Sequence, residues 1–185
     1  MAAVDFTNLA DVKSWLGVKT AENDETLSRM ITAASSSISQ VINRDIVATD
    51  YNIVAHGNGK DTLPMPSYPI LSVTALKIDG VSIQPSISYS APGYTFDDTT
   101  IYLRGGAKFT KDRNNIEVTY RAGFEIVPYE LQQACIEVVA ARWRERDRIG
   151  LSSKGLAGET TAFDLKDFPS QVKTMLANFK KVIPV

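Results

Sequence analysis

Apolar residues recur at steps of three and four near both ends of the chain, a spacing that predicts amphipathic helices. The first helix is short, from Asn8 to Leu16, and Gly17 supplies its C-terminal stop. A longer helix is expected with Asp24 as its N-cap and an apolar stripe that extends to Ile42. The opposite side of this helix is rich in serine, a weak helix former, so packing must supply part of its stability.

From about residue 50 to residue 124 the apolar period changes to two, which predicts strands. The strand-like runs are rich in β-branched and aromatic residues and cover Tyr51–Ala55, Val73–Ile78, Val81–Ile83, Thr100–Leu103 and Ile116–Tyr120. The Asp79-Gly80 pair joins two of these runs and is a strong signal for a tight hairpin. This part of the chain predicts a small antiparallel β module of about five or six strands.

Helical spacing returns after Pro128, a residue that fits the first turn of a helix. The apolar stripe of this helix runs from Leu131 to Trp143. A final helix is expected with Ser170 as its N-cap and Phe179 at the end of its apolar face. Residues 150–167, between the two helices, contain three glycines and no clear period, which predicts a long loop.

The elements together predict an α+β fold in which both termini build a small helical bundle and an antiparallel β module is inserted between them. Residues 1–49 and 127–185 form the bundle in this interpretation, and residues 50–126 form the insertion. A length of 185 residues with 44% hydrophobic and 22% charged residues is typical of a globular chain. We expect no membrane span and no signal peptide, and therefore a protein that stays in the cytoplasm where it is made.

The net charge of −1 is an average of two unlike parts. Residues 1–141 hold 11 basic and 16 acidic side chains, whereas residues 142–185 hold 9 basic and 5 acidic ones. The positive part begins with four arginines at alternate positions from Arg142 to Arg148. Arg144 and Arg148 are four residues apart, a spacing that costs stability unless a partner neutralises them. This favours intermolecular salt bridges or nearby DNA, with a solvated helix end as the alternative.

The search for catalytic and metal-binding residues finds no convincing site. One Cys and one His exclude an internal disulfide and a His/Cys zinc site within one chain. His56 has no local partner for acid–base work, and Cys135 lies on an apolar helix stripe. Residues 57–60 (GNGK) lack the spacing of a phosphate loop, and residues 170–173 (SQVK) lack the companion motifs of a serine hydrolase. We therefore expect no enzyme, no cofactor and no metal.

The order of several short motifs resembles the head–tail connector (adaptor) proteins of tailed bacteriophages and prophages, in their longer variety. The matching segments in the C-terminal third are Gln132–Gly150, Ser152–Thr160, Phe168–Lys173 and Phe179–Val185. Leu9–Gly17, the helix start Asp24–Leu27, Tyr68–Val73 and Val118–Gly123 agree as well. The resemblance covers nearly the whole chain and rests on the order and spacing of motifs that are individually weak.

The resemblance implies a structural virion protein without catalysis. Such connectors form a ring of about a dozen copies under the portal vertex, in which each copy contacts the next head to tail. The ring extends the DNA channel and presents a surface to the tail or to a stopper protein. The partners implied are the portal protein, neighbouring copies, the tail-completion or stopper protein and passing DNA that is not read by sequence. The location implied is the head–tail interface of the virion, after assembly in the bacterial cytoplasm.

The candidate residues for contact with other subunits or the portal are Arg142, Arg144, Arg146, Arg148, Ser152, Ser153, Lys154, Phe179, Lys180 and Lys181. The loop at residues 150–167 is expected to order against a neighbour or the portal, and the C-terminal helix and tail to dock into the portal. The alternative function is a DNA-binding or DNA-packaging accessory protein of a phage. The acidic remainder of the chain argues against tight independent DNA binding.

Overall fold

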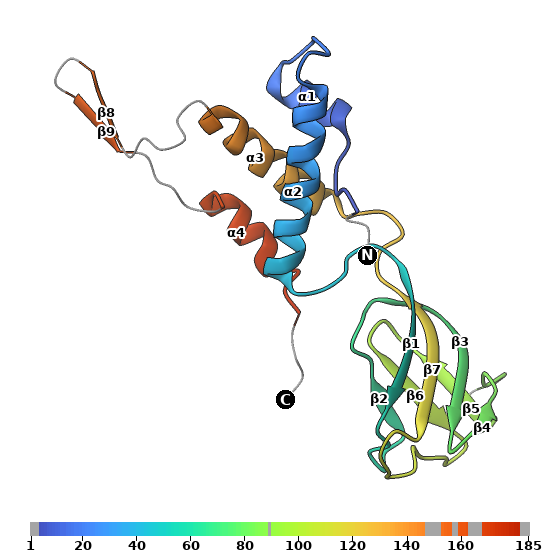
Figure 1. Ribbon diagram of the computed structural model, residues 1–185. Coiled ribbons are helices and arrows are strands. Elements are labelled where there is room, and N and C mark those ends of the chain that lie inside the picture. The colour runs from blue at the N-terminus through green and yellow to red at the C-terminus, as the bar shows by residue number, and fades with distance from the viewer. Residues whose placement is uncertain (1–3, 89, 147–152, 157–158, 163–167, 182–185) are drawn as a thin grey trace. The chain divides into compact units, whose positions relative to one another are not determined.

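The computed structural model describes residues 4–88, 90–146, 153–156, 159–162 and 168–181 of the chain. The chain divides into two units, one made of residues 1–44 and 127–185 and the other of residues 45–126. Among the described residues, the first unit contains four helices and the second contains seven strands (Figure 1). The predicted α+β fold class is confirmed.

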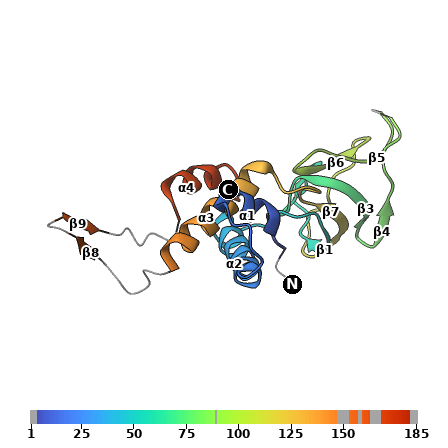
Figure 2. The same ribbon diagram turned by 90° about the horizontal axis from the view of Figure 1, so that it is seen from above.

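The helical unit contains α1 (Leu9–Leu16), α2 (Asp24–Ile42), α3 (Tyr129–Glu145) and α4 (Ser170–Ala177). Helix α3 packs against each of the other three helices, which Figure 2 shows grouped around it. The core of the helical unit is built from the apolar stripes that the sequence predicts. The following residues of these stripes are at most 2% exposed: Val12, Leu27, Ile31, Ile38, Leu131, Val138, Val172 and Leu176. Burial of these side chains supplies the stability that the serine-rich face of α2 does not.

The start of α2 differs by one residue from the prediction. The N-cap is Asn23, and Asp24 is the first residue within the helix. The Asp24 carboxylate instead accepts a hydrogen bond from Lys13 Nζ at 2.6 Å, which joins the end of α1 to the start of α2. The end of α1 agrees with the prediction, since Gly17 ends this helix in the left-handed region with a φ of 69°.

Prolines precede both C-terminal helices and act as their N-caps. Pro128 has φ −54° and ψ 138°, and Pro169 has φ −53° and ψ 146°, so both are extended residues outside the helix. Pro128 was expected within the first turn and Ser170 was expected as an N-cap, and both expectations are wrong by one residue. A fixed proline φ fits the cap position equally well, which moves Ser170 into the helix.

The β unit contains β1 (Thr49–Ala55), β2 (Thr62–Pro64), β3 (Ile70–Ile78), β4 (Val81–Ile83), β5 (Gly93–Phe96), β6 (Thr100–Arg104) and β7 (Ile116–Ala122). There are seven strands in this unit and not five or six. The two that the sequence pattern missed, β2 and β5, have only three and four residues. So short a run displays little of the alternation that identifies a strand, and β2 and β5 lack a signal like the Asp79-Gly80 turn that marks the equally short β4.

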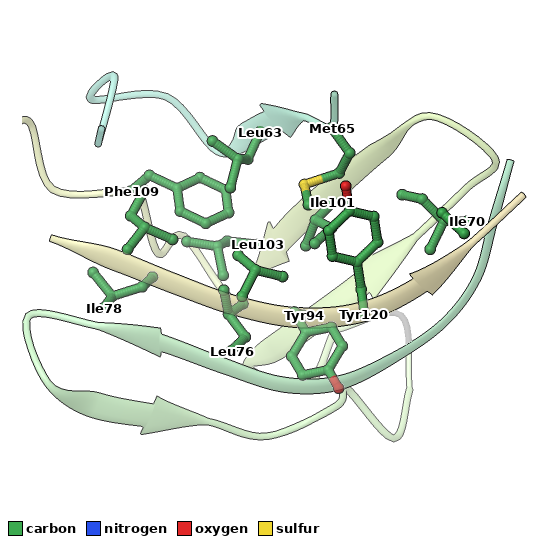
Figure 3. Close-up of a cluster of buried hydrophobic side chains, with 13 residues drawn as sticks. Leu63, Met65, Ile70, Leu76, Ile78, Tyr94, Ile101, Leu103, Phe109 and Tyr120 are labelled. Atoms are coloured by element: carbon green, nitrogen blue, oxygen red, sulfur yellow. The ribbon is translucent and has the colours of Figure 1, made fainter. Parts of the chain in front are cut away.

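The seven strands form two antiparallel sheets, in the orders β1-β7-β3-β4 and β2-β6-β5. Side chains from both sheets and from the loop between β6 and β7 fill the core, among them Leu76, Ile101, Tyr120 and the loop residue Phe109 (Figure 3). The predicted hairpin between β3 and β4 is present, and Asp79 and Gly80 both have positive φ, as its tight turn requires. Ile46 and Phe124 extend the unit beyond β1 and β7, since the Phe124 amide donates to the Ile46 carbonyl at 2.7 Å.

The segment between α3 and α4 is not the structureless loop that its sequence predicts. It contains the antiparallel pair β8 (Ser153–Leu156) and β9 (Glu159–Ala162), in which Ser153 lies opposite Ala162. β-Branched Thr160 and Thr161 favour this conformation. Gly150, the expected end of the preceding helix, lies outside the described residues.

Candidate subunit and portal interface

Arg142 makes a contact within the helical unit. Its side chain is half-buried, and Nη2 donates to Ser37 Oγ at 3.3 Å, which joins α3 to α2. The apolar stripe of α3 continues to this position, so the aliphatic part of the arginine packs where the stripe ends. The structure therefore gives the first of the predicted interface arginines a structural contact of its own.

The next two arginines of the described helix end are exposed. Arg146 places its guanidinium 3.6 Å from the centre of the Trp143 ring and donates to the Trp143 carbonyl at 3.2 Å. This stacking holds the charge at a fixed position on the surface of the helix end. Arg144 is exposed on the same helix end. Arg148 and Ser152 lie outside the described residues.

The remaining candidates fall on the hairpin and on the end of α4. Ser153 and Lys154 belong to β8, which pairs with β9. Phe179 is half-buried and Lys180 is exposed, just after α4. The backbone amide of Lys181 donates to the Ile42 carbonyl at 2.9 Å, which fixes the chain at the end of α2. The described candidates thus lie on three separate parts of the helical unit, namely the end of α3, strand β8 and the chain after α4.

His56 and Cys135 occupy structural positions. His56 Nδ1 accepts a hydrogen bond from the Asn114 amide at 2.9 Å and joins two loops of the β unit. Cys135 is buried in the helical core, with Sγ 3.5 Å from Ser35 Oγ. Burial raises the pKa of the Cys135 thiol, which keeps it protonated and unreactive. Among the described residues there is no group of three or more His, Cys, Asp and Glu side chains with the geometry of a metal site.

A second basic surface lies on the β unit, and the sequence analysis missed it. The loop of residues 56–61 runs beside the loop of residues 104–115, and Lys60, Lys108, Lys111 and Arg113 are exposed on them. The overall charge of residues 1–141 is negative and conceals this local excess. A count of charge over a window of ten residues, from Arg104 to Arg113, would have found it, with four basic side chains and one acidic.

The described part of the chain has no helix with both the length and the hydropathy required to cross a bilayer.

Comparison with solved structures identifies the class of fold. A chain in the neck of an empty gene transfer agent (GTA) particle, computed with C6 symmetry, has a TM-score of 0.58 at 19% identity, over 97% of this chain and 92% of that one. A chain in the virion of the native GTA particle has a TM-score of 0.59 at 18% identity, with the same two coverages. A chain in the native neck, computed with C12 symmetry, has a TM-score of 0.55 at 18% identity, over 100% and 98%. The fold is that of a neck protein.

The family follows from the sequence itself. The family model described as "Head completion protein" matches residues 5–182, and the chain belongs to this family. The protein is accordingly a structural head–tail connector, as the resemblance of its motifs predicted. The alternative of a DNA-binding or packaging accessory protein is not favoured by this match. No curated protein matches the chain.

Proposed function

We propose that the protein forms a ring of about a dozen copies on the portal vertex of the filled capsid, each copy contacting the next head to tail. The ring continues the DNA channel and offers a docking surface to the tail or to a stopper protein. The observation that carries the proposal is the family match over residues 5–182. The C6 and C12 symmetries of the GTA neck structures support the ring. The proposal assigns the protein to the virion neck after assembly in the host cytoplasm, and gives it no catalytic step.

Three parts of the helical unit are the proposed contacts with neighbouring copies and the portal. They comprise the arginine-rich end of α3, the β8–β9 hairpin and the chain that follows α4. An isolated two-stranded hairpin is marginally stable in water. Among the described residues β8 and β9 pair only with each other, so contact with another chain would stabilise this hairpin. The exposed Arg144 and the stacked Arg146 present positive charge to a partner surface.

The C-terminal residues are the proposed portal anchor. The amide of Lys181 is held by the Ile42 carbonyl, so the residues that follow start from a fixed point of the helical unit. They continue the sequence as Val182-Ile183-Pro184-Val185, an apolar segment after two lysines. Deletion of α4 itself would not test this anchor cleanly, because Val172 and Leu176 are core residues at 0% and 1% exposure.

A shorter truncation tests the anchor. A variant that ends after Lys181 keeps every buried residue of α4 and the Lys181–Ile42 hydrogen bond. We expect this variant to lose attachment to purified portal rings in sedimentation, with an unchanged circular dichroism spectrum. A variant that lacks residues 1–3 is the matched control and should attach like the wild type. Normal attachment of the variant truncated after Lys181 would contradict the proposed anchor.

A further inference from the structure

Charge is segregated within the β unit. Its 82 residues, 45–126, carry 7 basic and 9 acidic side chains. The two adjoining loops, residues 56–61 and 104–115, hold 5 of the basic and only 2 of the acidic ones, a net charge of +3. The rest of the unit holds 2 basic and 7 acidic side chains, a net charge of −5. One end of the unit is therefore a basic surface on an otherwise acidic module.

The two loops form one rigid platform. The Phe109 amide donates to the Lys60 carbonyl and the Gly59 amide to the Phe109 carbonyl, both at 2.8 Å. The Gly57 amide donates to the Asp112 carbonyl at 2.9 Å and also lies 2.9 Å from Asn115 Oδ1. The Phe109 side chain, at 0% exposure, anchors the longer loop in the core. The backbone carries its basic side chains at fixed positions, which lowers the entropic cost of binding a partner.

The platform lies at the end of the unit where β1 finishes and β7 begins, marked by the pair Ala55 and Ile116. The chain enters and leaves the unit at the opposite end of these strands, beyond the pair Thr49 and Ala122. Figure 1 shows this arrangement, with the loops at the far end of β1 and β7 from the connections. The surface is therefore at the tip of the inserted module.

The basic side chains of the tip are available to a ligand. Lys60, Lys108, Lys111 and Arg113 are exposed, and none forms an ion pair with a described residue. The acidic neighbours are Asp61 and Asp112, with Asp79 at the adjacent hairpin, where Oδ1 accepts from Asn115 Nδ2 at 3.0 Å. The fifth cation, Arg104, donates to the Ser88 carbonyl at 3.3 Å.

The other two cations of the β unit are ion-paired. Lys77 lies 3.2 Å from Glu117, and Arg121 lies 3.2 Å from Asp50. Both pairs join neighbouring strands of the four-stranded sheet. The two cations of the sheet are thus neutralised by ion pairs within it. The four exposed cations of the β unit without an ion pair to a described residue all lie at the tip.

We propose that this tip holds the phosphate backbone of duplex DNA. Three of its four exposed cations are lysines, which act as point charges on phosphate without a fixed geometry. Phe109, the only Phe, Tyr or Trp of the loops, is buried, and the exposed His56 ring is held by its hydrogen bond from the Asn114 amide, so the tip lacks the series of rings on which single-stranded bases stack. The contacts are electrostatic and independent of base sequence, as suits DNA that passes the protein without being read. The inference goes beyond the proposed function because it does not depend on ring formation.

The test is a titration of the full-length isolated protein into a fluorescently labelled DNA duplex of about 30 base pairs, at several salt concentrations. One variant combines K60Q, K108Q, K111Q and R113Q. The matched control combines K77Q and R121Q, which removes two cations from the same unit but not from its tip. A third variant combines R144Q, K180Q and K181Q in the helical unit. Thermal unfolding of each variant verifies that it is folded.

We expect the wild type to bind at low salt. In a plot of the logarithm of affinity against the logarithm of salt concentration, affinity should fall with a slope of about 0.9 per phosphate contact. The tip variant should lose at least about tenfold in affinity and reduce that slope by about 3. The control and the helical-unit variant should each remain within about twofold of the wild type. Retention of wild-type affinity and slope by the tip variant would overturn the proposal. So would failure of the wild type to bind at low salt, in which case loss of neck assembly by the tip variant would indicate an acidic protein partner.

Discussion

A single buried hydroxyl, that of Ser35, joins three segments of the helical unit. Its Oγ accepts a hydrogen bond from the Phe6 amide at 2.9 Å and lies 3.5 Å from Cys135 Sγ on α3. Ser35 itself is on α2 and is 1% exposed. Residues 4–8, the described part of the segment before α1, form no strand or helix that would pair their amides, so this side chain satisfies a donor that would otherwise be buried without a partner.

Replacement of Ser35 by alanine should therefore destabilise the protein by about 1–3 kcal/mol, since the Phe6 amide loses its acceptor in the core. Replacement of the adjacent, exposed Ser36 by alanine is the matched control and should change stability by less than about 0.5 kcal/mol. Urea unfolding measures both. Equal midpoints for the two variants would show that the Phe6 amide finds another acceptor.

At the scale of elements, the loops of the β unit are held by a close approach of two backbones. A Cβ added to Gly57 would lie 1.7 Å from the Thr110 carbonyl oxygen. Backbone atoms cannot move aside as a flexible side chain can, so any side chain at position 57 separates the two loops. The sequence Gly57-Asn58-Gly59-Lys60, which resembles a phosphate loop only faintly, is explained by this contact.

Replacement of Gly57 by alanine should lower the free energy of unfolding by about 3 kcal/mol, because the two loops must move apart. The control is replacement of Gly80 by alanine, where φ is also positive, at 79°, but no atom lies within 4 Å of the added Cβ. Backbone strain alone should cost that variant about 1 kcal/mol. Thermal or urea unfolding distinguishes the two, and a cost at position 57 no larger than at position 80 would contradict the close approach.

Elements with a repeating signal were predictable from the sequence, and short ones were not. Helix α2 repeats its apolar stripe over five turns, and the Asp79-Gly80 turn has a specific conformational requirement. Strands β2, β5, β8 and β9 have three or four residues each and are defined by the strands they pair with. The error at Asp24 arose because Asn23 and Asp24 are both good N-cap residues, whereas at Ser170 the cap position is taken by Pro169, which has no capping side chain.

At the scale of the whole molecule, the chain passes between the two units twice, near residues 44–45 and 126–127. The β unit has its own core of 13 buried side chains and its own hydrogen-bonded sheets. We propose that it is an independently folding insertion. A fragment of residues 45–126 should give a dispersed NMR spectrum and unfold cooperatively in urea. A collapsed spectrum without cooperative unfolding would contradict this independence.

The functional surfaces were only partly predictable. Sequence pattern and family resemblance indicated the arginine-rich helix end, yet they could not separate Arg142, which donates to Ser37, from the exposed Arg144. That distinction depends on the packing of α3 against α2. The basic tip was missed because the charge of residues 1–141 was summed as a whole, which conceals the four cations between Arg104 and Arg113, and only the fold brings Lys60 beside them. Surfaces assembled by tertiary structure leave little trace in a charge count of the whole chain.

We propose that copies of this connector close into a ring on the portal. The most direct measurement is the mass of the complex formed when the wild-type protein is mixed with purified portal rings, by native mass spectrometry or mass photometry. We predict a complex heavier than the portal by about a dozen copies of this 20.3 kDa chain, with few intermediate species because a closed ring is favoured. A portal mass that does not change in the presence of excess protein would contradict the account.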